Sequence, residues 1–393
     1  MSVPRHILPV IVLSQFFCTS LWFAGNGVMQ DLLEVFSLNA SALGNLTSAV
    51  QFGFISGTLL FAFLTVADRF SPSRVFLVSA LLGGLFNLGM AWEGNTYFSL
   101  FLLRFLTGFF LAGIYPVGMK IAADYYDKGL GKSLGYLVGA LVLGTAFPHL
   151  IKSFGQELPW RLVVYTTSTL AAVGGLMMFL LVPNGPYRKR SERPDFSAFY
   201  HVFKKPEFRS AAFGYFGHMW ELYAFWAFVP VMLAFYKSVN PGAQFHVSFL
   251  SFLIIAVGGL SCVIGGYLSL KWGPKRIAFI SLLSSCLCCL ISPLIFLMNS
   301  EILLLAFLLF WGMVVIADSP LFSTLVAKNA MAKNKGTALT IVNCLGFAIT
   351  IVSIQLLTAL IEIIPGEFLY LPLALGPILG LWALSSQSPG PVR

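Results

Sequence analysis

Charged side chains are scarce in this chain. Asp, Glu, Lys and Arg make up 10% of its 393 residues, whereas a soluble globular domain carries roughly 25%. Hydrophobic residues make up 58%, and the mean hydropathy is +0.86. This balance excludes an ordinary soluble protein. Because only helices and closed barrels satisfy the backbone in lipid, the long apolar runs predict an all-α membrane protein.

Cysteine is also rare, and none of it has the spacing of a disulfide frame or a metal site. All six cysteines lie within apolar stretches, at positions 18, 262, 286, 288, 289 and 344. Cys286, Cys288 and Cys289 are close together, but no His or carboxylate lies near them in the sequence. We therefore expect buried, reduced thiols, no disulfide and no cofactor.

Motifs of catalysis are missing as well. The chain has no nucleophile elbow, no phosphate-binding loop and no zinc-ligand spacing, and it has no long polar stretch that could form a soluble domain. We therefore do not expect an enzyme. Arg5 and His6 precede a long apolar stretch without a small-residue cleavage site, so the first segment is expected to be a membrane helix rather than a removed signal.

The apolar segments are long enough to cross a bilayer, which takes about 20 residues per helix. Twelve such spans are expected: 5–29, 41–66, 74–92, 96–122, 132–153, 160–182, 208–236, 246–270, 275–298, 302–327, 336–360 and 368–386. One long polar connection, 183–207, divides them into two halves of six spans, 1–182 and 208–393. We interpret 183–207 as a cytoplasmic linker between two domains.

Positive charge is distributed unevenly between the two sides of the predicted membrane. All but four of the 24 lysines and arginines fall in the termini and in loops on the N-terminal side; the exceptions are Arg104, Lys152, Arg161 and Lys237. By the positive-inside rule this places both termini in the cytoplasm of a cell-membrane protein. The bias also accounts for the net charge of +9 without a nucleic acid partner.

The two halves share a loop signature. Residues 67–76 read ADRFSPSRVF and residues 270–279 read LKWGPKRIAF, so that Arg69 matches Lys271, Pro72 matches Pro274 and Arg74 matches Arg276. The fourth span carries Gly108 and Pro116, and the tenth carries Gly312 and Pro320 in the same relation. These matches predict a duplicated six-helix unit. Parallel repeats of this kind place a substrate site near the midplane between them.

These motifs resemble those of the major facilitator superfamily over nearly the whole chain. The loop signature of that family, G-x-x-x-D-R-x-G-R-K, keeps Asp68 and Arg69, with Leu64 and Ser71 in place of its glycines. Leu100, Arg104 and Gly108 match the fourth-span pattern L-x-x-x-R-x-x-x-G. The fifth span has a glycine-rich run, at Gly135, Gly139, Gly144 and Pro148, that departs from the antiporter version of the family.

The resemblance implies a twelve-helix fold in two pseudo-symmetric halves, with alternating access to a central site. It implies a cytoplasmic latch at Asp68, Arg69, Arg74, Lys271 and Gly273. The stretch YFGHMWELYAFW at 215–226 is similar to a bacterial branch labelled nitrate- or cyanate-type permeases. We carry over that branch label without its substrate.

Five ionisable residues lie deep in the predicted spans, where charge is costly and usually functional. One of them, His149, follows Pro148 near the outer end of its span and is interpreted as an interfacial or helix-packing residue. His218 and Glu221 share a helix face, and Glu221 lies roughly 18 Å from Arg209 at the inner end of its span. Asp318 lies at a similar depth before Pro320, and Arg104 lies in the fourth span. For each, a structural alternative stays open: a buried polar tie, a patch for the break at Pro320, or contacts of Arg104 with backbone carbonyls.

We expect a secondary transporter of a small anionic solute, coupled to protons through Glu221, Asp318 and His218. Arg104 is the predicted anion contact. Further predicted substrate contacts are Trp22, Asn26, Trp220 and Tyr223. Two alternatives remain, a cation or metal-ion transporter using His218, Glu221 and Asp318, and an exporter or flippase of amphipathic compounds. The expected partners are the solute and the lipid bilayer, and we expect a monomer.

Overall fold

The computed structural model describes residues 4–126, 130–154, 159–188, 203–330 and 335–386. These residues form helices and connecting turns, and no strand occurs among them, so the all-α prediction is confirmed. Most of the predicted linker, residues 189–202, lies outside the described residues. Among the described residues, eleven helices or helix pairs are long and apolar enough to cross a membrane, and Ile7–Thr19 is a shorter apolar helix.

The chain divides into two compact units. Unit 1 comprises residues 1–193 and 227–259, and unit 2 comprises residues 194–226 and 260–393. The later part of the seventh span and the first half of the eighth thus belong to unit 1. The helices of residues 4–188 are α1 (Ile7–Thr19), α2 (Ala24–Gly27), α3 (Met29–Val35), α4 (Ala42–Phe63), α5 (Val66–Arg69), α6 (Pro72–Gly89), α7 (Tyr97–Leu111), α8 (Tyr115–Tyr125), α9 (Leu130–Ser153) and α10 (Arg161–Leu181).

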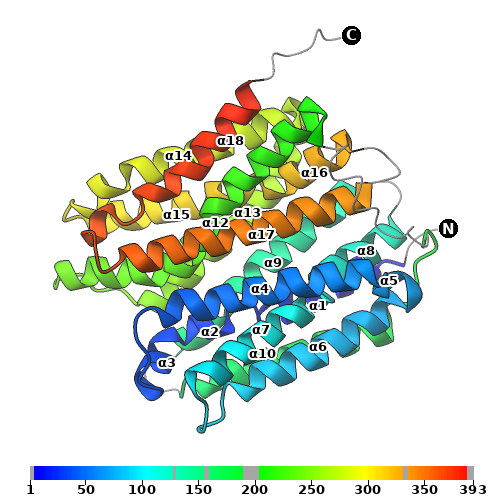
Figure 1. The fold of residues 1–393 in the computed structure, drawn as a ribbon, viewed down its shortest axis with the longest axis horizontal. Helices are drawn as coiled ribbons and strands as arrows, with labels where there is room; N and C mark the ends of the chain where they lie inside the picture. The colour runs from blue at the N-terminus through cyan, green and yellow to red at the C-terminus, as the bar shows by residue number, and fades with distance from the viewer. Residues whose placement is uncertain (1–3, 127–129, 155–158, 189–202, 331–334, 387–393) are drawn as a thin grey trace. The chain divides into compact units, whose positions relative to one another are not determined.

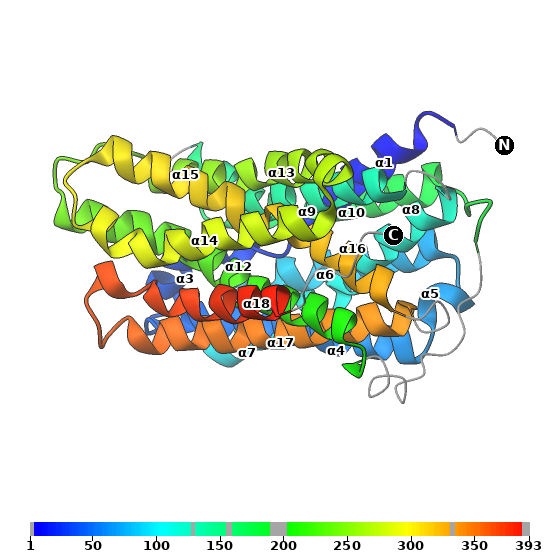
Figure 2. The same ribbon diagram turned by 90° about the horizontal axis from the view of Figure 1, so that it is seen from above.

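The later helices begin with α12, which runs without a break through Pro230. They are α12 (Pro206–Val239), α13 (Val247–Trp272), α14 (Pro274–Phe296), α15 (Glu301–Ala317), α16 (Ser319–Asn329), α17 (Lys335–Leu360) and α18 (Leu375–Ser385), with 3₁₀ turns at Gly366–Phe368 and Leu371–Ala374. Figure 2 shows α14 running beside α15, and the two helices are in contact.

Four of the twelve predicted spans are not single helices. The first, expected over 5–29, ends at Thr19 and continues as α2 and α3, in a stretch where Gly25 and Gly27 lower helix propensity. The last, expected over 368–386, becomes regular α-helix only at Leu375, after a 3₁₀ turn that contains Pro372. The expectation of one continuous helix was wrong at both ends of the chain.

The fourth and tenth spans break at matching positions. Span four stops at Leu111 and resumes as α8, with Pro116 in its first turn. Span ten stops at Ala317 and resumes as α16, with Pro320 in its first turn. In addition, α6 and α14 both begin at a proline, Pro72 and Pro274. The duplication inferred from sequence therefore extends to where helices start and break.

Within unit 1, α6 packs against α10, α1 lies against both α9 and α10, and α4 runs alongside α7 (Figure 1). Gly108, from the fourth-span motif, sets the α4–α7 distance. A Cβ atom at that position would lie 2.0 Å from the carbonyl oxygen of Val50, so only glycine allows this approach. Close contact through small residues is how membrane helices gain packing energy.

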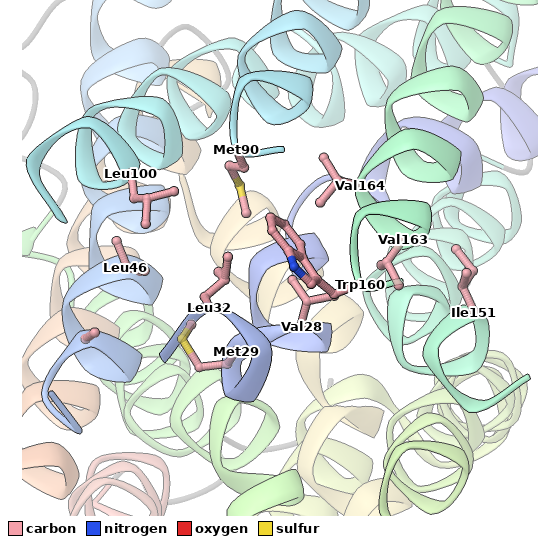
Figure 3. Packing of buried hydrophobic residues seen from close by; sticks show 11 residues of the cluster. Val28, Met29, Leu32, Leu46, Met90, Leu100, Ile151, Trp160, Val163 and Val164 are labelled. Carbon is pink, nitrogen blue, oxygen red and sulfur yellow. The ribbon is translucent and has the colours of Figure 1, made fainter. Parts of the chain in front are cut away.

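A hydrophobic cluster fills one end of unit 1. Figure 3 shows Trp160, before α10, lying among Val28, Met90 and Val164. Leu32 and Leu100 are fully buried in the same cluster. An ion pair between Lys152 of α9 and Asp31 of α3, 2.6 Å apart, lies at this end as well. The cluster holds the short helices after the first-span break in place.

Candidate functional site

His218 and Asp318 form a buried pair in unit 2. His218 lies in the middle of α12, and Asp318 is the single residue between α15 and α16. The Nδ1 atom of His218 lies 2.8 Å from Oδ1 of Asp318, and both side chains are 1% exposed. His218 Nε2 and Asp318 Oδ2 have no hydrogen-bond partner among the described residues. The break in span ten thus carries an acid that faces an imidazole.

Glu221 belongs to a different network from His218, although one helical turn separates them. Its carboxylate accepts hydrogen bonds from Trp311 Nε1 at 2.6 Å, Ser285 Oγ at 2.9 Å and Cys289 Sγ at 3.4 Å. Ser285 and Cys289 share one face of α14, and Trp311 comes from α15. Three donors from two helices hold this acid, so its side chain ties α12 to α14 and α15.

The metal alternative needs His218, Glu221 and Asp318 to converge. In the part of the chain that the structure describes, no group of three or more His, Cys, Asp or Glu side chains is placed to hold a metal ion. The donors around Glu221 occupy its oxygens, and His218 turns its Nδ1 to Asp318. His218 and Asp318 form one network and Glu221 belongs to another, whereas the metal alternative requires a single site with all three residues.

Arg104 lies at the middle of α7 in unit 1, with 1% of its surface exposed. Its guanidinium donates to the carbonyl oxygens of Leu21, at 3.1 Å, and Trp22. Both carbonyls lie in the break between α1 and α2, where helical hydrogen bonds are lost. Arg104 makes no ion pair with a carboxylate among the described residues. Its charge is therefore buried and compensated by carbonyl dipoles alone.

Trp22 and Asn26 flank that break and reach α4. The indole nitrogen of Trp22 donates to Gln51 Oε1 at 3.2 Å, and Asn26 Nδ2 donates to Thr47 Oγ1 at 2.8 Å. Gln51 and Thr47 were not predicted as site residues, although their four-residue spacing puts them on one helix face. The broken first span is thus joined to α7 through Arg104 and to α4 through two polar pairs.

The two predicted aromatic contacts in unit 2 have different surroundings. Trp220 donates from its indole nitrogen to the carbonyl oxygen of Pro372 at 3.1 Å. Tyr223 is 2% exposed, and its ring lies 5.2 Å from the rings of both Trp226 and Phe347. Trp220 ties α12 to the turn before α18, and Tyr223 lies in an aromatic cluster.

Of the predicted latch residues, Asp68 has the most defined contacts. Asp68 Oδ1 lies 2.7 Å from Lys120 Nζ of α8. Arg69 and Arg74 are exposed, and the described residues give neither side chain an ion pair. Lys271 lies over the ring of Trp272, 5.6 Å from its centroid. Gly273 has φ +82°, a backbone conformation that favours glycine, and it starts α14.

Comparison with known proteins places this arrangement in a family. The model of the Major Facilitator Superfamily matches residues 11–354. An uncharacterised transporter of Escherichia coli, YgaY (strain K12), is 28% identical over 194 residues, 47% of this chain and 47% of that protein. The 3-(3-hydroxy-phenyl)propionate transporter of Escherichia coli (strain K12) is 29% identical over 157 residues, 39% of this chain and 36% of that protein. The matches thus span less than half of each of these relatives.

Solved structures share the fold at lower sequence identity. A point mutant of the nucleoside transporter NupG superposes with a TM-score of 0.73 at 16% identity, covering 97% of this chain and 99% of that one. A bacterial homolog of the human lysosomal transporter Spinster, inward-facing and unoccupied, gives a TM-score of 0.70 at 16% identity, covering 98% and 94%. The family model covers most of the chain and the fold agrees with it, so this chain belongs to the Major Facilitator Superfamily.

Proposed function

We propose that this protein is a secondary transporter. It moves a small anionic solute and couples that movement to protons through His218 and Asp318. The observation that carries the proposal is the buried His218–Asp318 pair at the break of span ten. Broken spans are where transporters of this type bind substrates and coupling ions. An acid and an imidazole are costly to place at membrane depth, so such residues usually have a functional role.

Proton transfer at this pair changes its contacts directly. With Asp318 charged and His218 protonated, a charge-assisted contact joins α12 to the junction of α15 and α16. With either group neutral, that attraction is weakened and the junction is held less firmly. A proton can drive alternating access only if it binds the two states with different free energies, and a contact across a helix break supplies such a difference.

Two observations support an anionic solute. Arg104 keeps a buried positive charge that contacts only carbonyl oxygens and the Met90 sulfur among the described residues. A buried cation without an ion-pair partner is costly, and a bound anion relieves part of that cost. One relative is named for 3-(3-hydroxy-phenyl)propionate, which is a carboxylate at neutral pH.

The membrane orientation is part of the same proposal. The bias of lysine and arginine toward one set of loops favours cytoplasmic termini in the cell membrane. Modification of single cysteines at exposed positions, such as Phe98 at the start of α7 and Phe70 just after α5, with a membrane-impermeant thiol reagent on intact cells, tests it. Label at position 98 without label at 70 is expected, and the reverse pattern would refute the orientation.

The test of coupling is solute uptake into proteoliposomes with and without an imposed pH gradient. A thermal-shift screen of small carboxylates, including 3-(3-hydroxyphenyl)propionate, first identifies a solute that stabilises the purified protein. We expect uptake by the unmodified protein to follow the gradient, and Asp318→Asn and His218→Gln to lose that dependence. His149→Gln is a matched control, because His149 is also a buried histidine within a span.

Three results would each overturn a part of the proposal. If Asp318→Asn and Glu221→Gln both keep full gradient dependence, neither acid carries the coupling proton. If only Glu221→Gln loses it while folding normally, the coupling site is the Trp311 network instead. A screen in which only cations or neutral solutes stabilise the protein would refute the anionic substrate.

A further inference from the structure

The segment after α10 is folded onto unit 1 rather than leaving it at once. We call residues 182–188 the strap. Its backbone accepts two hydrogen bonds, from Ser73 Oγ to the carbonyl of Val182 at 2.7 Å and from the Tyr125 hydroxyl to the carbonyl of Pro183 at 2.6 Å. Ser71 Oγ donates to Asn184 Oδ1 at 2.9 Å. The strap therefore contacts both the 66–73 loop and the end of α8.

The second half of the strap continues along the same surface. The backbone N–H of Tyr187 donates to the carbonyl of Asp124 at 2.9 Å. Gly185 lies so close to α8 that a Cβ atom there would be 2.3 Å from the Asp124 carbonyl oxygen. Arg188 then reaches back to the loop, where Nη2 donates to the carbonyls of Asp68, at 3.2 Å, and Phe70, at 2.8 Å.

Charge explains why an arginine is needed at this place. The family signature G-x-x-x-D-R-x-G-R-K has basic residues at the positions that correspond to 72 and 73, and this chain has Pro72 and Ser73 there. Two acids, Asp68 and Asp124, lie at the loop and the end of α8. Lys120 pairs with Asp68, and both Lys120 and Arg188 interact electrostatically with Asp124. Arg188 thus brings a second cation from outside the loop.

We propose that the strap fastens the 66–73 loop to the end of α8, and that Arg188 supplies the positive charge that this loop lacks at positions 72 and 73. Arg188 is then a positioning residue of the latch, which the motif alone does not reveal. The connection between the two halves of the chain begins at Arg188 and not at the end of α10, because residues 182–187 are held by unit 1. The inference rests on contacts within unit 1 and is independent of the solute and of the coupling ion.

Burial of Ser73 gives a direct readout of the strap. Ser73 is 4% exposed and donates to the strap at Val182, so a cysteine at that position becomes reactive when the strap detaches. The experiment measures the rate at which Ser73→Cys in the purified full-length protein reacts with a maleimide, with the modified peptide quantified by mass spectrometry. The six native cysteines are all buried, and the measurement follows the peptide that contains position 73 alone.

We expect Arg188→Gln to accelerate labelling several-fold, and Arg188→Lys to restore part of the protection because lysine keeps the charge but donates to fewer carbonyls. Gly185→Ala should accelerate labelling by lifting the strap from α8 without any change of charge. Arg209→Gln, which changes an exposed arginine elsewhere in the chain, should leave the rate unchanged. Gel filtration of each variant establishes that it is folded before the rates are compared.

Equal labelling rates in Arg188→Gln and in the Ser73→Cys parent would overturn the role of Arg188. Fast labelling in the parent itself would overturn the strap. If Arg188→Gln does not fold, Gly185→Ala and Arg188→Lys decide the question, because unchanged protection in both is incompatible with a strap held by these contacts.

Discussion

The hydrogen bond between Glu221 and Trp311 offers a quantitative test of how unit 2 is held together. A hydrogen bond to a charged group contributes about 1.5–3 kcal/mol in water-soluble proteins, whereas interhelical bonds in membrane proteins average about 0.6 kcal/mol and reach about 1.7. This bond is 2.6 Å long, its acceptor is a carboxylate, and Glu221 is 1% exposed. All three features place it near the upper end of the membrane range.

We therefore expect a coupling energy of about 1.5 kcal/mol between the two side chains. The measurement is a double-mutant cycle of Glu221→Ala, Trp311→Phe and the double variant, with reversible unfolding by dodecyl sulfate in mixed micelles followed by circular dichroism. Trp311 also packs against Phe225 and Phe307, with ring centroids 4.7 and 5.4 Å away. The cycle cancels the loss of that packing, because it is lost with and without Glu221.

A cycle of Glu221→Ala with Phe307→Leu is the matched control. Phe307 contacts the same indole but has no hydrogen bond to Glu221. Its coupling energy should stay within about 0.5 kcal/mol of zero. A Glu221–Trp311 coupling no larger than the control would refute the reasoning that Glu221 is a fixed interhelical tie, and it would restore Glu221 as a carboxylate free to exchange protons.

The remaining predictions concern unit 1. Gly108→Ala should lower the thermal stability of the purified protein strongly, because its Cβ atom would meet the Val50 carbonyl oxygen. Gly135→Ala is the control and should not lower it, because nothing lies within 4 Å of its Cβ position. Equal melting temperatures of the two variants would contradict the close approach of α4 and α7. If Asn26 contacts the solute, Asn26→Ala should raise KM for a solute found in the screen and largely keep kcat. A loss of stability with unchanged KM would instead assign Asn26 to its bond with Thr47.

The spans could be predicted from sequence because hydrophobic length is a local property. The segment expected over 41–66 forms Ala42–Phe63, and that expected over 160–182 forms Arg161–Leu181. Helix breaks were harder to predict. A proline lies at two of them, Pro116 and Pro320. The break after Thr19 contains no proline, and its free carbonyl oxygens accept hydrogen bonds from Arg104 of another helix. Such a tertiary contact leaves no periodic signal.

Residue counting predicts the depth of the charged residues, but it did not predict their partners. Counting residues placed Glu221 and Asp318 at a similar depth and gave His218 and Glu221 a common face. One face of a helix covers a wide arc of its circumference, so two side chains on the same face can contact different neighbours. His218 meets Asp318, whereas Glu221 meets Trp311, Ser285 and Cys289. Which neighbour each acid finds depends on how α14 and α15 pack, and sequence spacing does not report that.

The two halves place their buried charges differently relative to the helix breaks. In unit 1 the charged residue is Arg104, which lies within α7 of span four. It donates to carbonyl oxygens at the break of span one. In unit 2 the charge at the break is itself an acid, Asp318 of span ten, and its partner His218 stands on the continuous span seven.

An arginine has only a charged form at physiological pH, whereas a carboxyl group and an imidazole each have a charged and a neutral form. The contact in unit 1 therefore keeps its charge, and we propose that the coupling proton changes the charge of the contact in unit 2. This asymmetry between the duplicated halves is the physical reason why we propose proton coupling at Asp318. It is also why we propose that the constant positive charge of Arg104 attracts the anionic solute.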